Sequence, residues 1–342
     1  MRFTFILGID ISKDWFDACL MNRQFEIVGE QRVVNRSDQI MEFISNLLDQ
    51  YDITDINSIF MCVEHTGLYN QNLVRCWLTK GGDLAIIPAN KISGNLAGPQ
   101  GWVEKTDTLD ARRIAEYGIR FSDKLLHYRV KSHTLELLQR LQRQRSRLLN
   151  AINTLRVPVS ESEDFDIVSI VERIKQNQAG SLAALETDLE NIDKLMEQTI
   201  AEDPYLNRVY HLITSVPGIG PITAFEVIIA TEGFTKFRPN QAKKFARYAG
   251  VIPLRHISGT SVRKKPRNTK IANRRLKPLL TMGATSLIRG KNAIGQYYQR
   301  KILEGKHHLT VINAIRNKLL LRIFAVVRND TTYKVDFEFV RN

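Results

Sequence analysis

This sequence contains few cysteines and no long apolar segment. Its 342 residues include only three cysteines, Cys19, Cys62 and Cys76, and none of them forms a CxxC pair. That spacing argues against a zinc site or a disulfide framework and fits a reducing compartment. No apolar run approaches the ~20 residues of a membrane-spanning helix. Asp10 also interrupts the N-terminal apolar run, which is too short for a signal peptide. We therefore predict a cytoplasmic protein with no membrane partner.

Acidic residues are almost missing from the C-terminal third. Residues 251–328 hold eighteen lysines and arginines but a single acidic residue, Glu304. The net positive charge of this segment is larger than that of the whole chain, which has a formal net charge of +13. Positive charge concentrated in this way predicts a polyanionic partner, most often nucleic acid.

The N-terminal part of the chain follows the order βββαβαβα. We predict strands at residues 3–9, 15–21, 25–34, 58–63 and 84–88. We predict helices at residues 37–51 and 69–79, near residue 89 and around residues 107–110. This order is typical of an α/β fold of the RNase H-like class, in which the first and fourth strands lie side by side in one sheet.

Four acids fall at the ends of these elements. Asp10 follows the first strand and Glu64 the fourth, while Asp107 and Asp110 lie three residues apart on one helix face. Neighbouring carboxylates repel each other unless a cation lies between them, and oxygen-only ligands favour Mg²⁺ or Mn²⁺ over Zn²⁺. Singly, each acid has an ordinary explanation as a turn residue, a surface acid or a residue of a helix's first turn. Together they predict a site where two metal ions flank one phosphate.

Long helices are predicted from about residue 132 onward. Apolar residues recur every three or four positions in 138–155 and again in 182–196, which predicts a coiled-coil hairpin or a dimer seam. The first helix is rich in arginine and the second in acids, so they suit pairing with each other, although the first could also touch nucleic acid. Residues 157–166, with Pro158, are predicted to be a polar connector.

A Pro-Gly-Ile-Gly turn lies between two predicted helices at residues 212–224. This is a helix-hairpin-helix pattern, in which Gly218 and Gly220 would let backbone amides approach a phosphate without side chains in the way. The plain alternative is a tight turn between two packed helices.

Ser258 and Gly259 are predicted to lie in a loop before a dense basic run. A serine hydroxyl there has what attack on a phosphate requires, because the cations would hold the strand and neutralise the developing charge. The basic residues that we expect to bind nucleic acid are Arg263, Lys264, Lys265, Arg267, Lys270, Arg274 and Arg275.

Six motifs, in order, span nearly the whole chain. They are GIDISK at 8–13, EHTGLY at 64–69, KTDTLDARR at 105–113, VPGIG at 216–220, YAGVIP at 248–253, and the Ser258-Gly259 loop with its continuation at 270–276. In combination they resemble the transposases of the insertion sequence 110 family, kin to the Piv and MooV DNA invertases. The segment IPLRH departs from the shorter turn usual in the family, which leaves Ser261 as an alternative to Ser258.

The resemblance implies a RuvC-like DEDD metal domain at residues 1–125, a coiled coil at 126–203 and a mainly α-helical transposase domain at 204–342. Asp10, Glu64, Asp107 and Asp110 would be the DEDD acids. Ser258 would attack DNA and form a covalent phosphoserine link, assisted by Mg²⁺ or Mn²⁺. The implied partners are double-stranded donor and target DNA, a structured non-coding guide RNA, and further copies of the chain in a dimer to tetramer. The implied location is the nucleoid of a bacterium or archaeon.

Two other classes of function remain open from the sequence. A RuvC-like nuclease would hydrolyse DNA with water and leave Ser258 idle, and a non-catalytic scaffold would only bind RNA. The presence of all four acids argues against the scaffold, and the Ser-Gly pair in its matching context argues against the hydrolytic nuclease.

Overall fold

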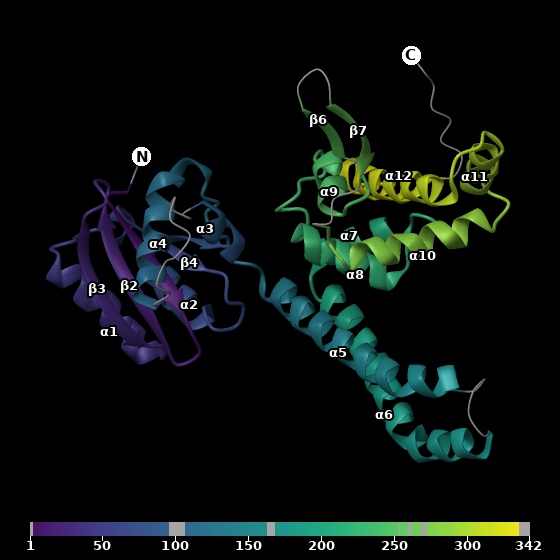
Figure 1. Ribbon diagram of the computed structural model, residues 1–342, viewed down its shortest axis with the longest axis horizontal. Coiled ribbons are helices and arrows are strands. Elements are labelled where there is room, and N and C mark those ends of the chain that lie inside the picture. The colour runs from purple at the N-terminus through teal and green to yellow at the C-terminus, as the bar shows by residue number, and fades with distance from the viewer. Residues whose placement is uncertain are drawn as a thin grey trace. The chain divides into compact units, whose positions relative to one another are not determined.

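The computed structural model describes residues 3–95, 107–162, 168–252, 254–258, 262–267 and 272–334. The chain divides into two compact units, Met1–Val130 and Lys131–Asn342. The helical pair predicted as a separate coiled-coil segment falls in the second unit, and the three-part division of the chain stays a prediction. Each unit is described by itself below (Figure 1).

A five-stranded mixed sheet with the order β3-β2-β1-β4-β5 forms the centre of the first unit. Strand β1 pairs antiparallel with β2 and parallel with β4, so the first and fourth strands are neighbours as predicted. This is the strand arrangement expected of an RNase H-like domain. The strands are β1 (Phe5–Ile11), β2 (Trp15–Asn22), β3 (Ile27–Val34), β4 (Ile59–Glu64) and β5 (Asp83–Ile87).

Helices cover both faces of this sheet because its central strands are apolar on both sides. Leu7 and Ile9 of β1 pack into a core with α1 (Ser37–Gln50) and α2 (Gln71–Thr79). Ile6, on the opposite face, belongs to a second core with α4 (Asp107–Arg120). The short elements of the unit are η1 (Ile56–Ser58), α3 (Ala89–Asn95) and η2 (Ser122–Lys124).

Gly8 allows α4 to lie directly on β1. A Cβ atom at Gly8 would be 2.3 Å from the carbonyl oxygen of Ala111 and 2.4 Å from the amide nitrogen of Ala115. Real Cβ atoms do not come so close to backbone atoms, so any larger residue at this position would push the helix away. The glycine of the GIDISK motif therefore fixes the distance between the helix and the strand.

Strand β1 is longer than the sequence predicts. It continues to Ile11, so Asp10 lies inside the strand rather than after it. The reason is that Ile11 is buried and pairs with Phe16 of β2, which extends the apolar alternation past the acid.

Two long helices, α5 (His133–Ser162) and α6 (Val168–Ala201), pack along each other in the second unit. Opposite charges join them as predicted, since Arg145 Nε lies 2.6 Å from Asp193 Oδ1 and Arg156 pairs with Glu186. The predicted connector is wrong in its first half because α5 continues through Pro158. Proline removes one helical hydrogen bond, and burial of Val159 one residue later favours keeping that turn in the helix.

The body of the second unit is helical and shares one apolar core. Leu138 of α5 and Met196 of α6 belong to this core, so the long pair is anchored in the body while the rest of it extends away (Figure 1). The helices of the body are α7 (Pro204–Thr214), α8 (Pro221–Thr231), α9 (Ala242–Tyr248), α10 (Leu276–Ile288), α11 (Ala293–Leu303) and α12 (His308–Asn329). No helix in the described parts of either unit is long and apolar enough to cross a membrane.

A two-stranded antiparallel ribbon rises from the helical body (Figure 1). It consists of β6 (Leu254–Ser258) and β7 (Val262–Arg267). The prediction of a loop at Ser258 is wrong, since this residue ends β6 and is the register partner of Val262. The basic residues of β7 concealed the strand signal, although Ile257 and Val262 are good strand formers.

We predict that Gly8→Ala destabilises the first unit by about 1–3 kcal/mol, as overpacking of a tight contact usually does. All three tryptophans fall within the sequence of this unit, so their fluorescence during urea unfolding reports on it alone. The control is Gly180→Ala in α6, where a Cβ would meet no atom within 4 Å. The control should leave the tryptophan transition unchanged. A Gly8→Ala protein with the wild-type urea midpoint would contradict the tight contact.

Candidate active site

Asp10 and Glu64 lie at adjoining positions on two parallel strands. Ile9 is the register partner of Val63, and each acid is the next residue along its strand. Both acids face the layer that contains α4, because side chains alternate along a strand and the residues two positions earlier face α4. Those residues are Gly8, which contacts α4 directly, and Cys62, whose Sγ would lie 2.7 Å from a Cβ at Gly118.

Helix α4 runs in the opposite direction to β1. Gly118, near its end, lies against Ile6, while Ala111 and Ala115 lie against Gly8. The N-terminal turn of α4 is therefore directed to the end of β1 that carries Asp10. Asp107 and Asp110 are the first and fourth residues of this helix, so the backbone brings both toward the two strand acids.

The side chains do not converge into a ready metal site among the described residues. No group of three or more His, Cys, Asp or Glu is arranged there to hold a metal ion, and the side chain of Asp107 lies outside the described residues. Asp110 Oδ1 accepts a hydrogen bond of 2.9 Å from Arg113 Nη1. The available donors of Asp10, Glu64 and Asp110 are all carboxylate oxygens, and such a set fits Mg²⁺ or Mn²⁺.

The ribbon of the second unit carries Ser258 and much of the predicted nucleic-acid surface. In the register of the ribbon, Ile257 is opposite Arg263 and His256 is opposite Lys264. Lys265 and Arg267 also lie in β7. Arg274 and Arg275 are exposed just before α10, whereas Gly259, Ser261 and Lys270 lie outside the described residues.

The Pro-Gly-Ile-Gly turn connects α7 to α8, as its sequence predicts. Gly218 has a φ of +84°, which favours glycine, and Gly220 is the exposed N-cap of α8. Gly218 also packs closely on α10, because a Cβ built at Gly283 would be 2.2 Å from the carbonyl oxygen of Gly218. Contact between helices thus accounts for Gly218, while Gly220 is open to solvent.

Comparison with known proteins identifies the family. Residues 7–157 match the transposase model DEDD_Tnp_IS110, and residues 210–299 match the model of the Transposase IS116/IS110/IS902 family. The chain belongs to the IS110 family of transposases, enzymes that act on DNA.

Relatives and a solved structure extend the comparison. This transposase is 26% identical to the pilin gene-inverting protein of Moraxella bovis over 96% of its own length and 97% of that protein. It is 24% identical to the transposase for insertion sequence element IS1111A of Coxiella burnetii, over 96% of its own length and 91% of that protein. A structure of T. thermophilus RuvC in complex with a Holliday junction substrate matches with 11% identity and a TM-score of 0.26. That match covers 35% of this transposase and 95% of the RuvC chain.

Asp17 is an acid beside the site that sequence reasoning missed. It is the register partner of Asp10 on β2, is only 5% exposed, and accepts hydrogen bonds of 3.0 and 2.8 Å from Arg32. A buried carboxylate requires such a partner. The sequence does indicate an unusual residue here, since Asp17 is the one acid in the mainly apolar strand β2.

Asn35 was also missed, and it ties together the segments that follow Asp10 and Glu64. Its side-chain nitrogen donates to the carbonyl oxygens of Ser12 at 3.0 Å, Lys13 at 3.4 Å and Tyr69 at 2.9 Å. Ser12 and Lys13 follow β1, and Tyr69 follows β4. An asparagine just before a helix gives no sequence signal of such a role, since it resembles a turn residue.

A bidentate ion pair fixes the outer side of α4 to the sheet. Arg112 of α4 donates two hydrogen bonds to Glu30 of β3. These hydrogen bonds hold the pKa of Glu30 below its usual value. The pair thus restrains the helix turn that carries Asp110.

We predict that Asn35→Ala destabilises the first unit by about 1–3 kcal/mol, since it removes the buried amide that donates to all three carbonyl groups. The measurement is again urea unfolding followed by tryptophan fluorescence. Asn46→Ala, at an exposed position of α1, is the matched control and should have little effect. If the two variants unfolded at the same urea concentration, Asn35 would not join the two segments.

Proposed function

We propose that this transposase cuts and rejoins DNA strands through a covalent link between Ser258 and a DNA phosphate. The acids Asp10, Glu64, Asp107 and Asp110 would bind Mg²⁺ or Mn²⁺ beside that phosphate. The observation that carries the proposal is the direction of α4, which brings Asp107 and Asp110 toward the adjoining acids of β1 and β4. Membership of a transposase family adds independent support.

Each group has a distinct role in the proposed reaction. Asp10 and Glu64 provide carboxylate oxygens from the rigid sheet, and Asp107 and Asp110 provide them from the helix. The bound cations, when present, stabilise negative charge on the attacking and leaving oxygens. Arg113 pairs with Asp110 and limits the repulsion between the acids before a cation binds.

The strand-transfer step conserves phosphodiester bonds. The Ser258 hydroxyl oxygen attacks phosphorus, a serine–phosphate bond forms, and one bond from phosphorus to a deoxyribose oxygen breaks. The proton lost by the serine hydroxyl is balanced by the proton that the leaving deoxyribose oxygen takes up. A deoxyribose hydroxyl of another strand then reverses the step, so rejoining needs no ATP because the bond energy is kept in the serine link.

The partners of this reaction are double-stranded donor and target DNA and a structured guide RNA. Arg263, Lys264, Lys265 and Arg267 on β7 would neutralise backbone phosphates, along with Lys270, Arg274 and Arg275. Gly220 would add backbone amides at the start of α8. The low number of acids in this part of the chain supports binding of a polyanion.

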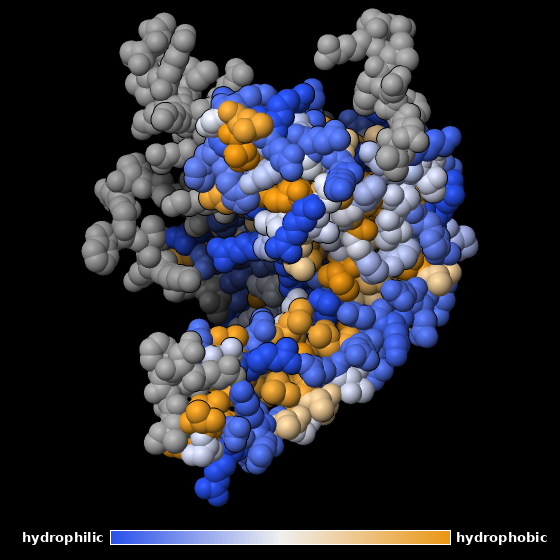
Figure 2. Space-filling view, turned by 90° about the vertical axis from the view of Figure 1, so that its right-hand side faces the viewer, coloured by the Kyte–Doolittle hydropathy of each residue, from blue (hydrophilic) through white to orange (hydrophobic). Residues whose placement is uncertain are grey.

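We also propose that further copies of the chain associate through α5 and α6. Figure 2 shows a mainly hydrophilic face with separate hydrophobic patches. Large apolar side chains are exposed where the two helices approach their connection, and exposed apolar surface of this kind often marks an interface. They are Val157, Val168, Ile170 and Ile174. A dimer or tetramer is the proposed assembly.

We predict that Asp10→Asn and Glu64→Gln each weaken Mn²⁺ binding by at least about tenfold, because each removes a charged ligand. Titration calorimetry on the full chain gives the affinity without requiring catalysis. Glu42→Gln, an exposed acid of α1, is the control. Wild-type Mn²⁺ affinity in both site variants would remove the metal site from the proposal.

We predict that Ser258→Ala abolishes a covalent protein–DNA adduct, while Ser261→Ala retains it. The assay combines protein, Mg²⁺, the RNA that flanks the gene and a nicked donor-junction DNA, followed by a denaturing gel. Filter binding should show unchanged RNA affinity for Ser258→Ala. Loss of the adduct only in Ser261→Ala would move the nucleophile to that residue. Cut DNA without an adduct in the wild type would favour the nuclease that uses water, and RNA binding without any cleavage would favour the scaffold.

A further inference from the structure

A buried carboxylate connects three elements near the base of the β6–β7 ribbon. Glu226 of α8 is only 4% exposed. Its Oε1 accepts a hydrogen bond of 3.1 Å from Asn273 Nδ2, and its Oε2 accepts one of 3.2 Å from Gln142 Nε2 on α5. One side chain thus joins α8 to the long helix α5 and to the segment that returns from β7.

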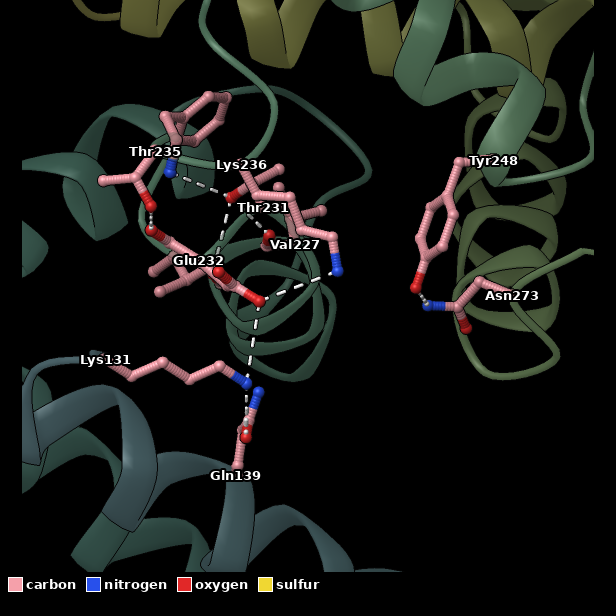
Figure 3. Close-up of polar contacts among 11 residues, drawn as sticks. Lys131, Gln139, Val227, Thr231, Glu232, Thr235, Lys236, Tyr248 and Asn273 are labelled. Carbon is pink, nitrogen blue, oxygen red and sulfur yellow. Dashed lines mark hydrogen bonds and ion pairs between the residues drawn. The ribbon is translucent and has the colours of Figure 1, made fainter. Parts of the chain in front are cut away.

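Asn273 brings together the chain segments before and after the ribbon. Its backbone N–H donates to the carbonyl oxygen of Tyr248, at the end of α9, over 3.1 Å. Its Nδ2 also approaches the Tyr248 hydroxyl at 3.5 Å (Figure 3). Its Oδ1 accepts from the backbone N–H groups of Arg275 and Leu276 and so begins α10. The chain enters the ribbon after Tyr248 and leaves it before Asn273, so both sides meet at this asparagine.

A second side-chain contact holds the segment that leads into β6. Asn313 of α12 donates a hydrogen bond of 2.8 Å to the carbonyl oxygen of Val251, three residues before β6. The base of the ribbon is therefore tied by side chains to α8 and α12. An isolated two-stranded ribbon is only marginally stable in water, so its direction depends on such contacts.

Burial of the Glu226 carboxylate costs desolvation free energy. An apolar residue would avoid this cost at the same position. Burial raises the pKa of Glu226, and the hydrogen bond from Asn273, the charge of Arg275 and the hydrogen bond from Gln142 act in the opposite direction. None of these partners forms a direct ion pair with it among the described residues. Packing alone does not explain an acid here, whereas a bridge with two acceptor atoms does.

We propose that Glu226 and Asn273 are positioning residues that hold the ribbon, and with it Ser258, in the direction required for attack on DNA. This inference rests on the function proposed above. Neither side chain acts on the reacting atoms. Their effect is geometric, and a displacement of about 1 Å at a reacting group lowers a rate by about 100-fold.

Three variants separate bridging from other roles. Asn273→Ser keeps an oxygen that can begin α10 but is too short to reach Glu226. Glu226→Leu fills the space without accepting hydrogen bonds. Glu226→Gln keeps an acceptor for Asn273. If the Gln142 amide turns over, the new N–H group can donate to Oε1 of Gln142, an atom that is buried without a partner among the described residues.

The matched control is Thr231→Val on the same helix as Glu226. Thr231 is fully buried and donates a hydrogen bond of 2.7 Å to the carbonyl oxygen of Val227. It also accepts one of 3.2 Å from the backbone N–H of Phe234. Figure 3 shows it apart from the Tyr248–Asn273 contact. Its substitution should lower the melting temperature without disturbing the ribbon.

The first readout is limited trypsin digestion of the folded full chain, with cleavage mapped to Arg263, Lys264 and Arg267. We expect Asn273→Ser and Glu226→Leu to speed cleavage there by about fivefold or more, since local opening exposes backbone to the protease. Glu226→Gln and Thr231→Val should be cleaved at the wild-type rate. Equal cleavage rates in all variants would contradict the proposal that Glu226 and Asn273 hold the base of the ribbon.

The second readout is the rate of Ser258 adduct formation at saturating DNA. We expect Asn273→Ser and Glu226→Leu to lower this rate by about tenfold or more, with the half-saturating DNA concentration unchanged. Glu226→Gln should restore the wild-type rate. Wild-type rates in the first two variants, or an equal loss in Thr231→Val, would overturn the inference. If the wild type formed no adduct, the proposed function would fail, and the trypsin readout would still decide whether these residues hold the ribbon.

Discussion

The contact between α4 and Gly8 is the constraint on which the first unit depends. Because β1 has no side chain at this point, the helix backbone approaches the strand directly. The approach sets the height of α4 above the sheet, and the pairing of Gly118 with Ile6 and Cys62 sets its direction. With both fixed, the first turn of α4 comes to the end of β1 and β4 where Asp10 and Glu64 adjoin.

Charged side chains then restrain elements that apolar packing leaves free to slide. In the first unit, Arg112 and Glu30 join α4 to the edge of the sheet. In the second unit, Arg145 and Asp193 set the register of α5 against α6. Glu232 lies 3.6 Å from both Lys131 and Lys236 and so fixes the start of α5 near the end of α8 (Figure 3). Directional contacts of this kind specify an arrangement even where they add little stability.

Much of the first unit could be predicted from the sequence because its signals are local. Short apolar runs identify the strands, and the order of elements places β1 beside β4. The tight helix–strand contact could not be predicted, since Gly8 alone does not say which element lies above it. Asn35 was missed for a related reason, because its three acceptors are backbone atoms far away in the sequence.

The second unit shows where charge conceals structure. The sequence predicts a loop at Ser258 before the basic run, yet Ser258 ends β6 and the first part of the basic run forms β7. Strand pairing there depends on the partner strand rather than on the apolar alternation that sequence reasoning uses. The role of Glu226 cannot be predicted from the sequence, because Gln142 and Asn273, which bind its carboxylate, lie far from it along the chain.

The most direct test of this account is anomalous X-ray scattering from crystals of the full chain grown with Mn²⁺. The account predicts a manganese peak at the end of β1 and β4, bound by Asp10 and Glu64 and by the first turn of α4. A peak at another position, or none in a protein that still transfers DNA strands, would contradict the claim that the crossing of α4 over Gly8 builds the metal site.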